Sequence, residues 1–505
     1  MNCLLIYPKN PEGNFWYFDS IVRRYLQNFK FLKRKRKATY IPLGLLTVAA
    51  IIHEKFEKWI LKLIDLNVEE LIENHIKWAD VVFISAMIVQ KENTQEIIRR
   101  CKALGKIVIA GGPLFTTQYN EFSEVDHLIL NEAEVTLPLF LKDLKENKPK
   151  RIYTSKERAD LGKSPIPAFW LINLWNYVAM SIQTNRGCPF YCEFCGITSM
   201  LGHKVRTKTP SQVLVELQTL YDIGWRGSIF IVDDNLIGNI PKAREMLREI
   251  SQWQKKNGYP FKFLTQVSIN LAKDEELVRL FIEANIGKVF VGIESPDPKN
   301  LDECEKIQNI NIDMLSAIKK LLTNGIQVMA GLIYGFDKDN EETRRDLEDF
   351  TQRSGIVNTM PNLLTALPET RFWERLRREN RLLLESSSSA QINKGLNFLH
   401  QKKEEIKINY HRLLENIYSR RNYYKRIDTF LRYYKHKIRD KIFSWSNLIA
   451  FLKSIFYIGI FSRENIYYWM LIIKLIISRK KRKSFGVAIE MAISGKNFFK
   501  MAKMF

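Results

Sequence analysis

Long apolar runs and cysteines are both scarce in this 505-residue chain. No run of 18 uncharged apolar residues occurs; the two nearest candidates, Asn447–Phe461 and Ile466–Ser478, are short for a membrane span and are each interrupted by a lysine. The stretch from Met1 to Tyr7 is strand-like and lacks the basic and apolar regions of a signal peptide. Six cysteines are too few for a disulfide framework. We therefore expect a cytoplasmic protein, with peripheral binding to the inner face of the membrane as an alternative.

Acidic residues are scarce relative to basic ones. The chain has 78 Lys and Arg against 55 Asp and Glu, and most of the excess lies from Gln401 to Phe505, with 24 basic against 7 acidic residues. This charge favours an anionic partner, either nucleic acid or an acidic membrane surface; the alternative is compositional drift, because Lys, Ile and Asn are abundant throughout. Hydrophobic residues make up 46%, which is typical of a globular rather than a disordered protein, and the length predicts about two to four domains.

Short apolar strands alternate with helices up to residue 147. The strand-like runs are Cys3–Tyr7, Trp59–Asp65, Val81–Ser85, Ile107–Ala110 and His127–Leu130. The helical stretches are Leu43–Phe56, Val68–Trp78, Thr94–Leu104 and Val135–Glu146. Five strands with helices between them predict an α/β domain, 1–147, with a doubly wound, Rossmann-like parallel sheet. Ligands of such sheets bind beyond the carboxyl ends of the strands.

A linker at 148–176, which contains Pro165 and Pro167, precedes a second alternating region at 177–370. Its predicted strands are Ala179–Thr184, Ser228–Val232, Phe263–Val267, Val289–Ile293, Val328–Ile333 and Asn358–Thr365. Its predicted helices are Pro210–Ile223, Pro241–Lys256, Asp274–Ala284, Ile312–Asn324 and Asn340–Gln352. Six βα repeats predict a partial (β/α)6 TIM-type barrel with its chemistry at the carboxyl ends of the strands. The remaining segment, 371–505, is predicted to be helical and basic.

Three cysteines follow the first strand of this barrel: Cys188, Cys192 and Cys195, with the spacing C-x3-C-x2-C. Three thiolates in one loop can bind three irons of a four-iron cluster and leave the fourth iron open for a chelating substrate. The alternative is a zinc knuckle, for which His203 is a candidate fourth ligand. The other cysteines are weaker candidates: Cys3, Cys101 and Cys304 are expected to be core or incidental residues.

The loop from Arg186 to Cys195 resembles the cluster signature of the radical S-adenosylmethionine superfamily. Further segments, His203–Pro210, Gly224–Gly227, Val232–Asn235 and Val291–Glu294, resemble the cobalamin-binding branch, and within it the group containing hopanoid C-2 methylase. The resemblance covers most of residues 3 to 370. It implies three cofactors, a [4Fe-4S] cluster, S-adenosylmethionine and cobalamin, and a reductase, ferredoxin or flavodoxin as electron donor. It also implies that one electron cleaves S-adenosylmethionine to a radical that abstracts hydrogen from the substrate.

Several residues at the barrel strand ends are candidates for binding S-adenosylmethionine. They are Arg206, Asp233, Asp234, Ser268, Asn270, Glu294 and Gly331. Carboxylates can accept hydrogen bonds from an ammonium group, although the family usually has a glycine-rich segment where Asp233 and Asp234 stand. The alternative for these two is capping of the next helix. Arg206 is expected to pair with a carboxylate or a cobalamin side chain, or to be solvated. No catalytic residue is assigned beyond the cluster cysteines.

The candidates for cobalamin follow the strands of the first sheet. They are Asp65, Asn67, Ser85, Met87, Gly111, Gly112 and Glu132. Glycines after a strand let a large flat ligand approach the backbone; the alternative is that they only form a tight turn. Many cobalamin domains present a histidine to cobalt from Asp-x-His-x-x-Gly, but the matching residues here are Asp65, Asn67 and Glu70. If cobalamin binds, its cobalt should lack a histidine ligand from this loop.

The resemblance implies a cobalamin-dependent radical methylase acting on an unactivated carbon of a small molecule or a hydrophobic lipid such as a hopanoid. One alternative keeps the cofactors but rearranges or cyclises the substrate without methyl transfer. Another is a basic nucleic-acid-binding protein with a structural cluster, but we expect no nucleic-acid partner. The segment from Arg420 to Phe505, with Tyr423-Tyr424 and Tyr433-Tyr434 among basic residues, is expected to bind an anionic membrane surface. The alternative is that its helices pack against the barrel.

Overall fold

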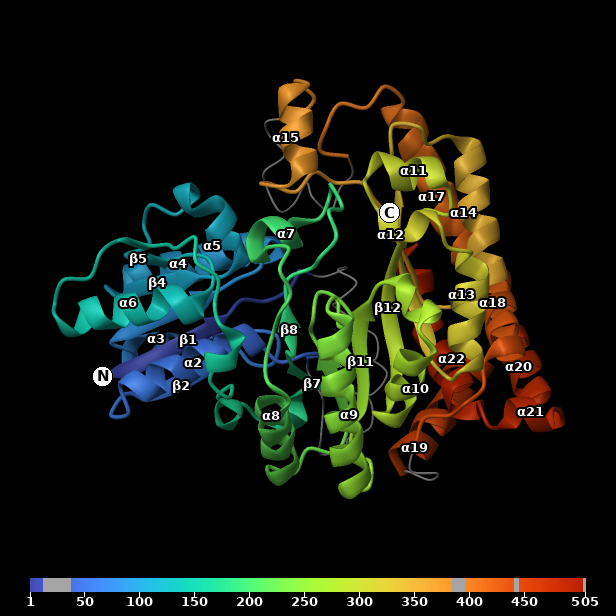
Figure 1. The fold of residues 1–505 in the computed structure, drawn as a ribbon, viewed down its shortest axis with the longest axis horizontal. Helices are drawn as coiled ribbons and strands as arrows, with labels where there is room; N and C mark the ends of the chain where they lie inside the picture. The colour runs from blue at the N-terminus through green and yellow to red at the C-terminus, as the bar shows by residue number, and fades with distance from the viewer. Residues whose placement is uncertain (12–37, 384–395, 440–444, 503–505) are drawn as a thin grey trace.

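The computed structural model describes residues 1–11, 38–383, 396–439 and 445–502. Two α/β units lie side by side, and a group of helices extends from the second of them (Figure 1). The first unit forms one end of the molecule, and the C-terminal helices form the other. No helix in the described part of the chain is both long and apolar enough to cross a bilayer.

The first sheet has six parallel strands in the order β2-β1-β3-β4-β5-β6. They are β1 (Asn2–Tyr7), β2 (Ile60–Asp65), β3 (Val81–Ser85), β4 (Ile107–Gly111), β5 (His127–Ile129) and β6 (Ile152–Tyr153). The five predicted strands are confirmed, but the sheet has a sixth, β6, within the stretch predicted to be a linker. Two residues are too short to produce an alternating pattern, so β6 is recognised only by its pairing with β5.

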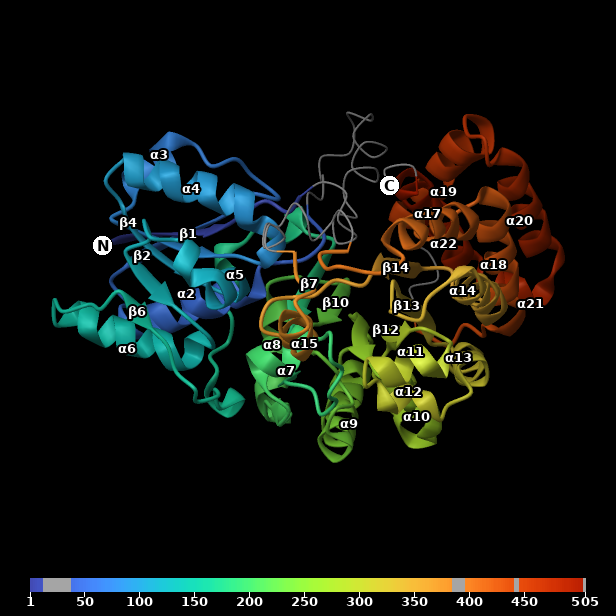
Figure 2. The same cartoon turned by 90° about the horizontal axis from the view of Figure 1, so that it is seen from above.

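Helices cover both faces of this sheet (Figure 2). They are α2 (Leu43–Lys55), α3 (Glu73–Trp78), α4 (Lys91–Ala103), α5 (Pro113–Gln118) and α6 (Ala133–Lys145). Alternate residues of β1 separate the two faces: Leu4 belongs to the core under α3, α4 and α5, whereas Leu5 belongs to the core under α2 and α6. The doubly wound prediction is therefore confirmed. The helix predicted from Val68 begins only at Glu73.

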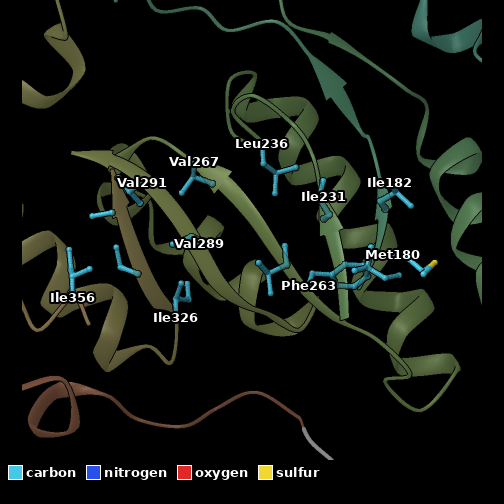
Figure 3. Packing of buried hydrophobic residues seen from close by; sticks show 14 of the residues in the cluster. Met180, Ile182, Ile231, Leu236, Phe263, Val267, Val289, Val291, Ile326 and Ile356 are labelled. Carbon is cyan, nitrogen blue, oxygen red and sulfur yellow. The ribbon is translucent and has the colours of Figure 1, made fainter. Parts of the chain in front are cut away.

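The second sheet has six parallel strands in sequential order. They are β7 (Ala179–Ile182), β10 (Ser228–Ile231), β11 (Lys262–Val267), β12 (Ile286–Glu294), β13 (Gln327–Tyr334) and β14 (Thr359–Leu363). The covering helices are α8 (Pro210–Asp222), α9 (Ile240–Lys256), α10 (Glu275–Glu283), α13 (Met314–Thr323) and α14 (Glu341–Ser354). Aliphatic side chains from neighbouring strands form the core of this unit (Figure 3). Since β7 and β14 are its two edges, the sheet is an open arc, which confirms the partial barrel.

Short elements that sequence patterns did not predict surround the carboxyl ends of the second sheet. They are the hairpin β8 (Asn185–Arg186) and β9 (Arg206–Thr207), and the helices α7 (Gly196–Leu201), α11 (Pro298–Glu303) and α12 (Ile307–Ile310). Short 3-10 helices occur at Ile88–Gln90, Tyr119–Glu121, Leu161–Lys163, Phe169–Leu171, Leu174–Asn176 and Ile269–Lys273.

The C-terminal segment is helical, as predicted. It contains α15 (Arg371–Arg378), α17 (Lys403–Ile417), α18 (Arg420–Tyr433), α19 (Trp445–Ser454), the π-helix η8 (Ile455–Ile460), α20 (Asn465–Ile477), α21 (Arg479–Arg482) and α22 (Phe485–Met501). The hydroxyl groups of Tyr410 and Tyr418 donate to backbone oxygens of the edge strand β14, at 3.0 and 2.6 Å. These helices thus cover an edge that would otherwise offer unpaired backbone groups.

The tyrosine pairs of α18 are not arranged as expected for a membrane surface. Tyr423, Tyr424 and Tyr434 are buried, and Tyr433 is half-buried. The Tyr423 hydroxyl donates to the backbone oxygen of Met491 in α22 at 2.8 Å. For α18, the structure therefore corrects the membrane expectation in favour of the alternative, packing against neighbouring helices and the barrel.

Candidate cofactor and active site

A cavity of about 320 Å³ lies between the two α/β units, at the carboxyl edge of the first sheet. Its lining comes from both units. The first contributes residues that follow β3, β4 and β5 together with side chains of α2, and the second contributes Gln183, Arg186 and Val232. Parallel sheets bind ligands at this edge, so the cavity stands where the sequence predicted a ligand.

Two glycines form one wall of the cavity. A Cβ on Gly111 would lie 2.6 Å from the backbone oxygen of Ile129, and a Cβ on Gly112 would lie 2.9 Å from Ser85 Oγ. Gly112 also has a φ of +91°, which other residues rarely adopt. Both positions therefore require glycine, and the bare backbone is open to a large flat ligand. The alternative, a tight turn, accounts for the positive φ but not for the cavity beside it.

Four of the predicted cobalamin residues line this cavity: Ser85, Gly111, Gly112 and Glu132. The other three, Asp65, Asn67 and Met87, are not among its lining residues. Met87 has an exposed side chain. Of the seven residues predicted to contact cobalamin, Met87 is therefore the least suited to do so.

Asp65 is buried and ties the first sheet to the start of the second unit. Its carboxylate accepts hydrogen bonds from the backbone and side-chain nitrogens of Asn67 and, at 3.0 Å, from the Tyr177 hydroxyl. Burial raises its pKa to about 6, although these hydrogen bonds oppose the shift. The Asn67 amide also contacts Pro8 and Asn10. These contacts give Asp65 and Asn67 a positioning role.

Charged side chains from both units meet beside the cavity. Glu132 is 4% exposed, and its Oε2 accepts from Arg186 at 2.8 Å and from Arg206 at 2.7 Å. Glu134 accepts from Arg186 at 2.8 Å and from Ser164 at 3.0 Å. Burial tends to raise the pKa of Glu134, but the charge and hydrogen bonds of Arg186 outweigh it, so the pKa lies below its usual value.

This group of charges connects the cavity to the cysteine loop, because Arg186 stands two residues before Cys188. Arg206 pairs with the carboxylate of Glu132 and donates to the backbone oxygens of Ala159 and Leu201. Arg206 was predicted to pair with a carboxylate, to contact a cobalamin side chain or to be solvated. These contacts favour the pair with a carboxylate. Sequence reasoning placed Glu134 after the fifth strand but did not predict its pair with Arg186, since nothing in the local pattern shows the distant arginine.

The cysteine loop is shaped by contacts near its start. Gly187 has a φ of +96°, and a Cβ there would lie 2.9 Å from the backbone oxygen of Lys204. The Gly187 nitrogen donates to Asp234 at 3.0 Å, and the Cys188 nitrogen donates to the backbone oxygen of Gly202 at 3.3 Å. The turn therefore requires glycine and holds the first thiolate in a defined place.

Asp233 is fully buried, and both its oxygens are used by the chain that leads into the cysteine loop. It accepts from the backbone nitrogens of Thr184 and Asn185, at 2.7 and 3.0 Å, and from the Thr184 hydroxyl. Burial raises its pKa to about 7. The next helix, α9, is instead capped by Asn239. These contacts differ from both roles predicted for Asp233, which were contact with an ammonium group and capping of the next helix. They indicate instead that Asp233 positions the cysteine loop.

A buried ion pair lies on the other side of the cysteine loop. Lys306 donates to Glu294 at 2.8 Å, and Gln308 donates to the Cys192 sulfur at 3.4 Å. Glu294, at the end of β12, has a φ of +63°, a strained conformation that often marks a functional site. Burial lowers the pKa of Lys306, but Glu294 and Cys192 hold it above its usual value. Lys306 and Gln308 were not identified from the sequence, because they lie in an ordinary charged segment.

Of the remaining predicted residues, Gly331 lies inside β13, whereas Ser268 and Asn270 follow β11. A Cβ on Gly331 would lie 3.9 Å from Glu294 Oε2, so these two positions are brought together. Ser268 and Asn270 are half-buried at the end of β11, where the Ser268 nitrogen donates to Asn235 at 3.2 Å. The structure thus brings the strand ends expected to hold S-adenosylmethionine to the same edge as the cysteines.

The cysteines fit a cluster better than a single ion. In the described ranges, no three Cys, His, Asp or Glu side chains gather closely enough to hold one metal ion. His203, the candidate fourth zinc ligand, stacks on Tyr191 with ring centroids 3.8 Å apart. A four-iron cluster takes one thiolate per iron, so its ligands do not meet at one point. Cysteine is also the residue that such clusters prefer.

Comparisons with known proteins agree with this geometry. The sequence model of the Radical SAM superfamily matches residues 182–351, and that of the B12 binding domain matches residues 30–141. The chain is 41% identical over 401 residues to an uncharacterized methyltransferase of Synechocystis sp., covering 79% of this chain and 72% of that protein. It is 35% identical over 356 residues to the hopanoid C-2 methylase of Rhodopseudomonas palustris, covering 70% and 67%.

The chain belongs to the cobalamin-dependent radical S-adenosylmethionine methyltransferases. Its cofactors are a [4Fe-4S] cluster, S-adenosylmethionine and cobalamin. The matched B12 region contains Ser85, Gly111, Gly112 and Glu132, and the matched radical region contains the three cysteines. Residues 370–505 match a domain of unknown function.

Solved structures of this methyltransferase's relatives show the same fold. TsrM from Kitasatospora setae, with cobalamin and a [4Fe-4S] cluster bound, superposes with a TM-score of 0.58 at 16% identity, over 75% of this chain and 78% of that one. OxsB with aqua-cobalamin bound gives a TM-score of 0.63 at 14% identity, over 100% and 80%. At these identities the likeness concerns the fold alone.

Proposed function

We propose that this methyltransferase adds a methyl group to an unactivated carbon of a hydrophobic lipid such as a hopanoid. The observation that carries the proposal is the shared boundary between the two sites: Arg186 lines the cavity of the first unit and lies two residues before Cys188. This arrangement suits one substrate that reacts with the cofactors of both halves of the enzyme. The similarity to hopanoid C-2 methylase supports a lipid as that substrate.

The cofactors supply the reactive chemistry when bound: the cluster and S-adenosylmethionine provide the radical that removes hydrogen from carbon, and cobalamin provides the methyl group. The chain holds and orients them. Cys188, Cys192 and Cys195 are the proposed iron ligands. Glu294 ends β12, and its carboxylate lies near both Lys306 and Gly331 of β13, so we assign it to S-adenosylmethionine.

The remaining contacts to S-adenosylmethionine are assigned to Ser268, Asn270 and Asp234. Cobalamin is assigned to the cavity lined by Ser85, Gly111, Gly112 and Glu132. We further propose that cobalt has no histidine ligand from this chain. Asn67 takes the place of the usual histidine, and its amide donates to Pro8 and Asp65. The described residues that line the cavity include no histidine. A nitrogen splitting from a protein imidazole in the paramagnetic spectrum of the cobalt would contradict this.

Electrons are proposed to come from a reductase, ferredoxin or flavodoxin. Tyr191, inside the cysteine loop, is 53% exposed, so a protein donor has access to the loop from solvent. A reduced cluster also needs a reducing compartment, which supports the cytoplasm. A lipid substrate supports a position at the membrane surface.

The proposal is tested by anaerobic turnover of the reconstituted full-length enzyme with a panel of hopanoid lipids, followed by mass spectrometry. A product heavier by one methyl group, with 5′-deoxyadenosine formed alongside, is expected. A product of unchanged mass would instead identify the rearrangement or cyclisation alternative. If methyl groups appear only on polar substrates in a wider panel, the lipid assignment is wrong.

A further inference from the structure

The helix α20 is apolar on two opposite faces. Tyr468, Leu471, Ile472 and Leu475 are buried against the neighbouring helices. On the opposite face, Ile466, Met470, Ile473 and Ile477 have exposed fractions of 68%, 49%, 53% and 76%. Their spacing of three or four residues places them in one row along the helix. A helix that is apolar all round is normally covered on all sides, but among the described residues nothing covers this outer row.

Neighbouring elements also expose large apolar side chains. Phe456 and Ile460 of η8 and Phe461 after it are 49%, 56% and 69% exposed. The Trp469 indole of α20 donates to the backbone oxygen of Gly459 at 2.9 Å, which holds η8 against α20. Leu452 of α19 is exposed as well. We call these residues the outer apolar surface: Leu452, Phe456, Ile460, Phe461, Ile466, Trp469, Met470, Ile473, Ile476 and Ile477. So many large exposed side chains in one region mark an interaction site.

A basic run follows directly at the end of α20. It consists of Arg479, Lys480, Lys481, Arg482 and Lys483, all exposed except Lys481, which is half-buried. Within the described part of the chain, no acidic side chain forms an ion pair with these five. Lys474, which interrupts the apolar sequence, instead pairs with Asp428 of α18 and so turns away from the outer row. Apolar surface and positive charge are thus adjacent but separate.

We propose that the outer apolar surface and the basic run dock the enzyme on an anionic lipid bilayer, with α20 lying in the interface. This inference deepens the proposed lipid substrate and names the partner surface. The helix has 13 residues and is about 20 Å long, too short for the roughly 30 Å hydrocarbon core. Amphipathic segments with basic flanks lie in the headgroup region, where lysine and arginine meet anionic lipid.

Charge favours the bilayer over a second copy of this chain. A second copy of this chain packed on α20 would add another basic run to the interface and would not neutralise the first. An anionic surface neutralises it instead. The docking elements also lie at the opposite end of the molecule from the first sheet (Figures 1 and 2), so docking leaves the cavity between the two units uncovered.

Flotation of the full-length protein with lipid vesicles tests the proposal. We expect binding to vesicles of phosphatidylcholine with phosphatidylglycerol, weaker binding to phosphatidylcholine alone, and release at high salt. The variant Met470→Gln, Ile473→Gln, Ile477→Gln and the variant Arg479→Gln, Lys480→Gln, Arg482→Gln, Lys483→Gln should each bind about tenfold or more weakly. The matched control is Ile60→Gln with Ile307→Gln, two similarly exposed isoleucines elsewhere, which should bind as the parent does.

Equal flotation of all variants would overturn the proposal. So would a concentration-dependent dimer in analytical ultracentrifugation that Ile473→Gln abolishes, since that result would assign the surface to a second copy. Vesicle binding is measured without substrate or reductant. Turnover of detergent-dispersed substrate by the same variants therefore separates failure of docking from failure of the proposed function.

Discussion

The two proposed ligand sites lie at corresponding edges of the two parallel sheets, but they use different parts of the chain. At the first sheet, Gly111 and Gly112 offer bare backbone, and a side chain at either position would collide with its neighbours. At the second sheet, side chains dominate: three cysteines, and the buried pair of Glu294 and Lys306. The first site is therefore specified by shape and the second by chemistry. Glu132, bonded to Arg186 and Arg206, joins them.

A change at Gly112 acts on the first site alone. The change Gly112→Ala adds a Cβ at a φ of +91° and 2.9 Å from Ser85 Oγ, so the cavity wall must shift. We expect cobalamin affinity to fall about 5- to 150-fold, because the cost of such strain is on the order of 1–3 kcal/mol. Equilibrium dialysis measures the affinity, and iron content should stay unchanged.

A matched control for this change is Gly486→Ala. That glycine lies inside α22 with nothing within 4 Å of an added Cβ, so cobalamin affinity should be that of the parent. If Gly112→Ala binds cobalamin as tightly as the control does, the first site is not specified by its backbone.

The link between the two sites is tested by Glu132→Gln. The change removes the buried negative charge between Arg186 and Arg206, and loss of one member of a buried ion group costs about 3–5 kcal/mol. We expect the free energy of unfolding in urea to fall by an amount of this order, and the bound cobalamin and the bound iron both to decrease.

The exposed pair Glu96–Arg99 supplies the control: Glu96→Gln should lower the free energy of unfolding by less than about 1 kcal/mol. Loss of one cofactor alone would mean that Glu132 does not couple the sites.

A smaller effect is expected from pH at Asp65, which holds Tyr177 against the first sheet. Its pKa is raised by burial to about 6 in the folded protein, above its ordinary value of about 3.8. The folded state therefore binds the proton more readily. The stability from this group is present below pH 4 and is lost as pH rises through about 6.

The variant Asp65→Asn removes this titration. Compared with the parent, its free energy of unfolding should change less with pH between 4 and 6, as measured by urea titrations at each pH. Asp233, whose pKa is raised to about 7 by burial, titrates in the same sense in both proteins, so it cancels in the difference. An identical slope in parent and variant would show that Asp65 is not the group responsible.

Much of the fold was predictable because buried parallel strands are short continuous apolar runs. The strands predicted at Val81–Ser85 and Phe263–Val267 agree with β3 and β11 to within a residue. The two-residue strand β6 was not predicted, since it exists only through its pairing with β5. The three proposed cysteine ligands were predicted from spacing alone, because a loop of eight residues carries the whole signal.

Residues whose role depends on distant contacts were harder to predict. Lys306 and Gln308 approach Cys192 from a segment more than a hundred residues away, and no local sequence pattern predicts this contact. The tail illustrates the same point: Tyr424 and Ile473 are both large residues in basic surroundings, yet one is buried and the other exposed. Composition predicted an interaction role for the whole tail, but only packing separates α18 from α20.

The central claim is that one chain holds two separate cofactor sites. It is tested most directly by the cofactor content of the variant Cys188→Ala, Cys192→Ala, Cys195→Ala after anaerobic reconstitution. The parent should hold about four irons and cleave S-adenosylmethionine to 5′-deoxyadenosine when reduced. The variant should lose the iron and this cleavage while still binding cobalamin as the parent does. A variant that still forms 5′-deoxyadenosine would contradict the account.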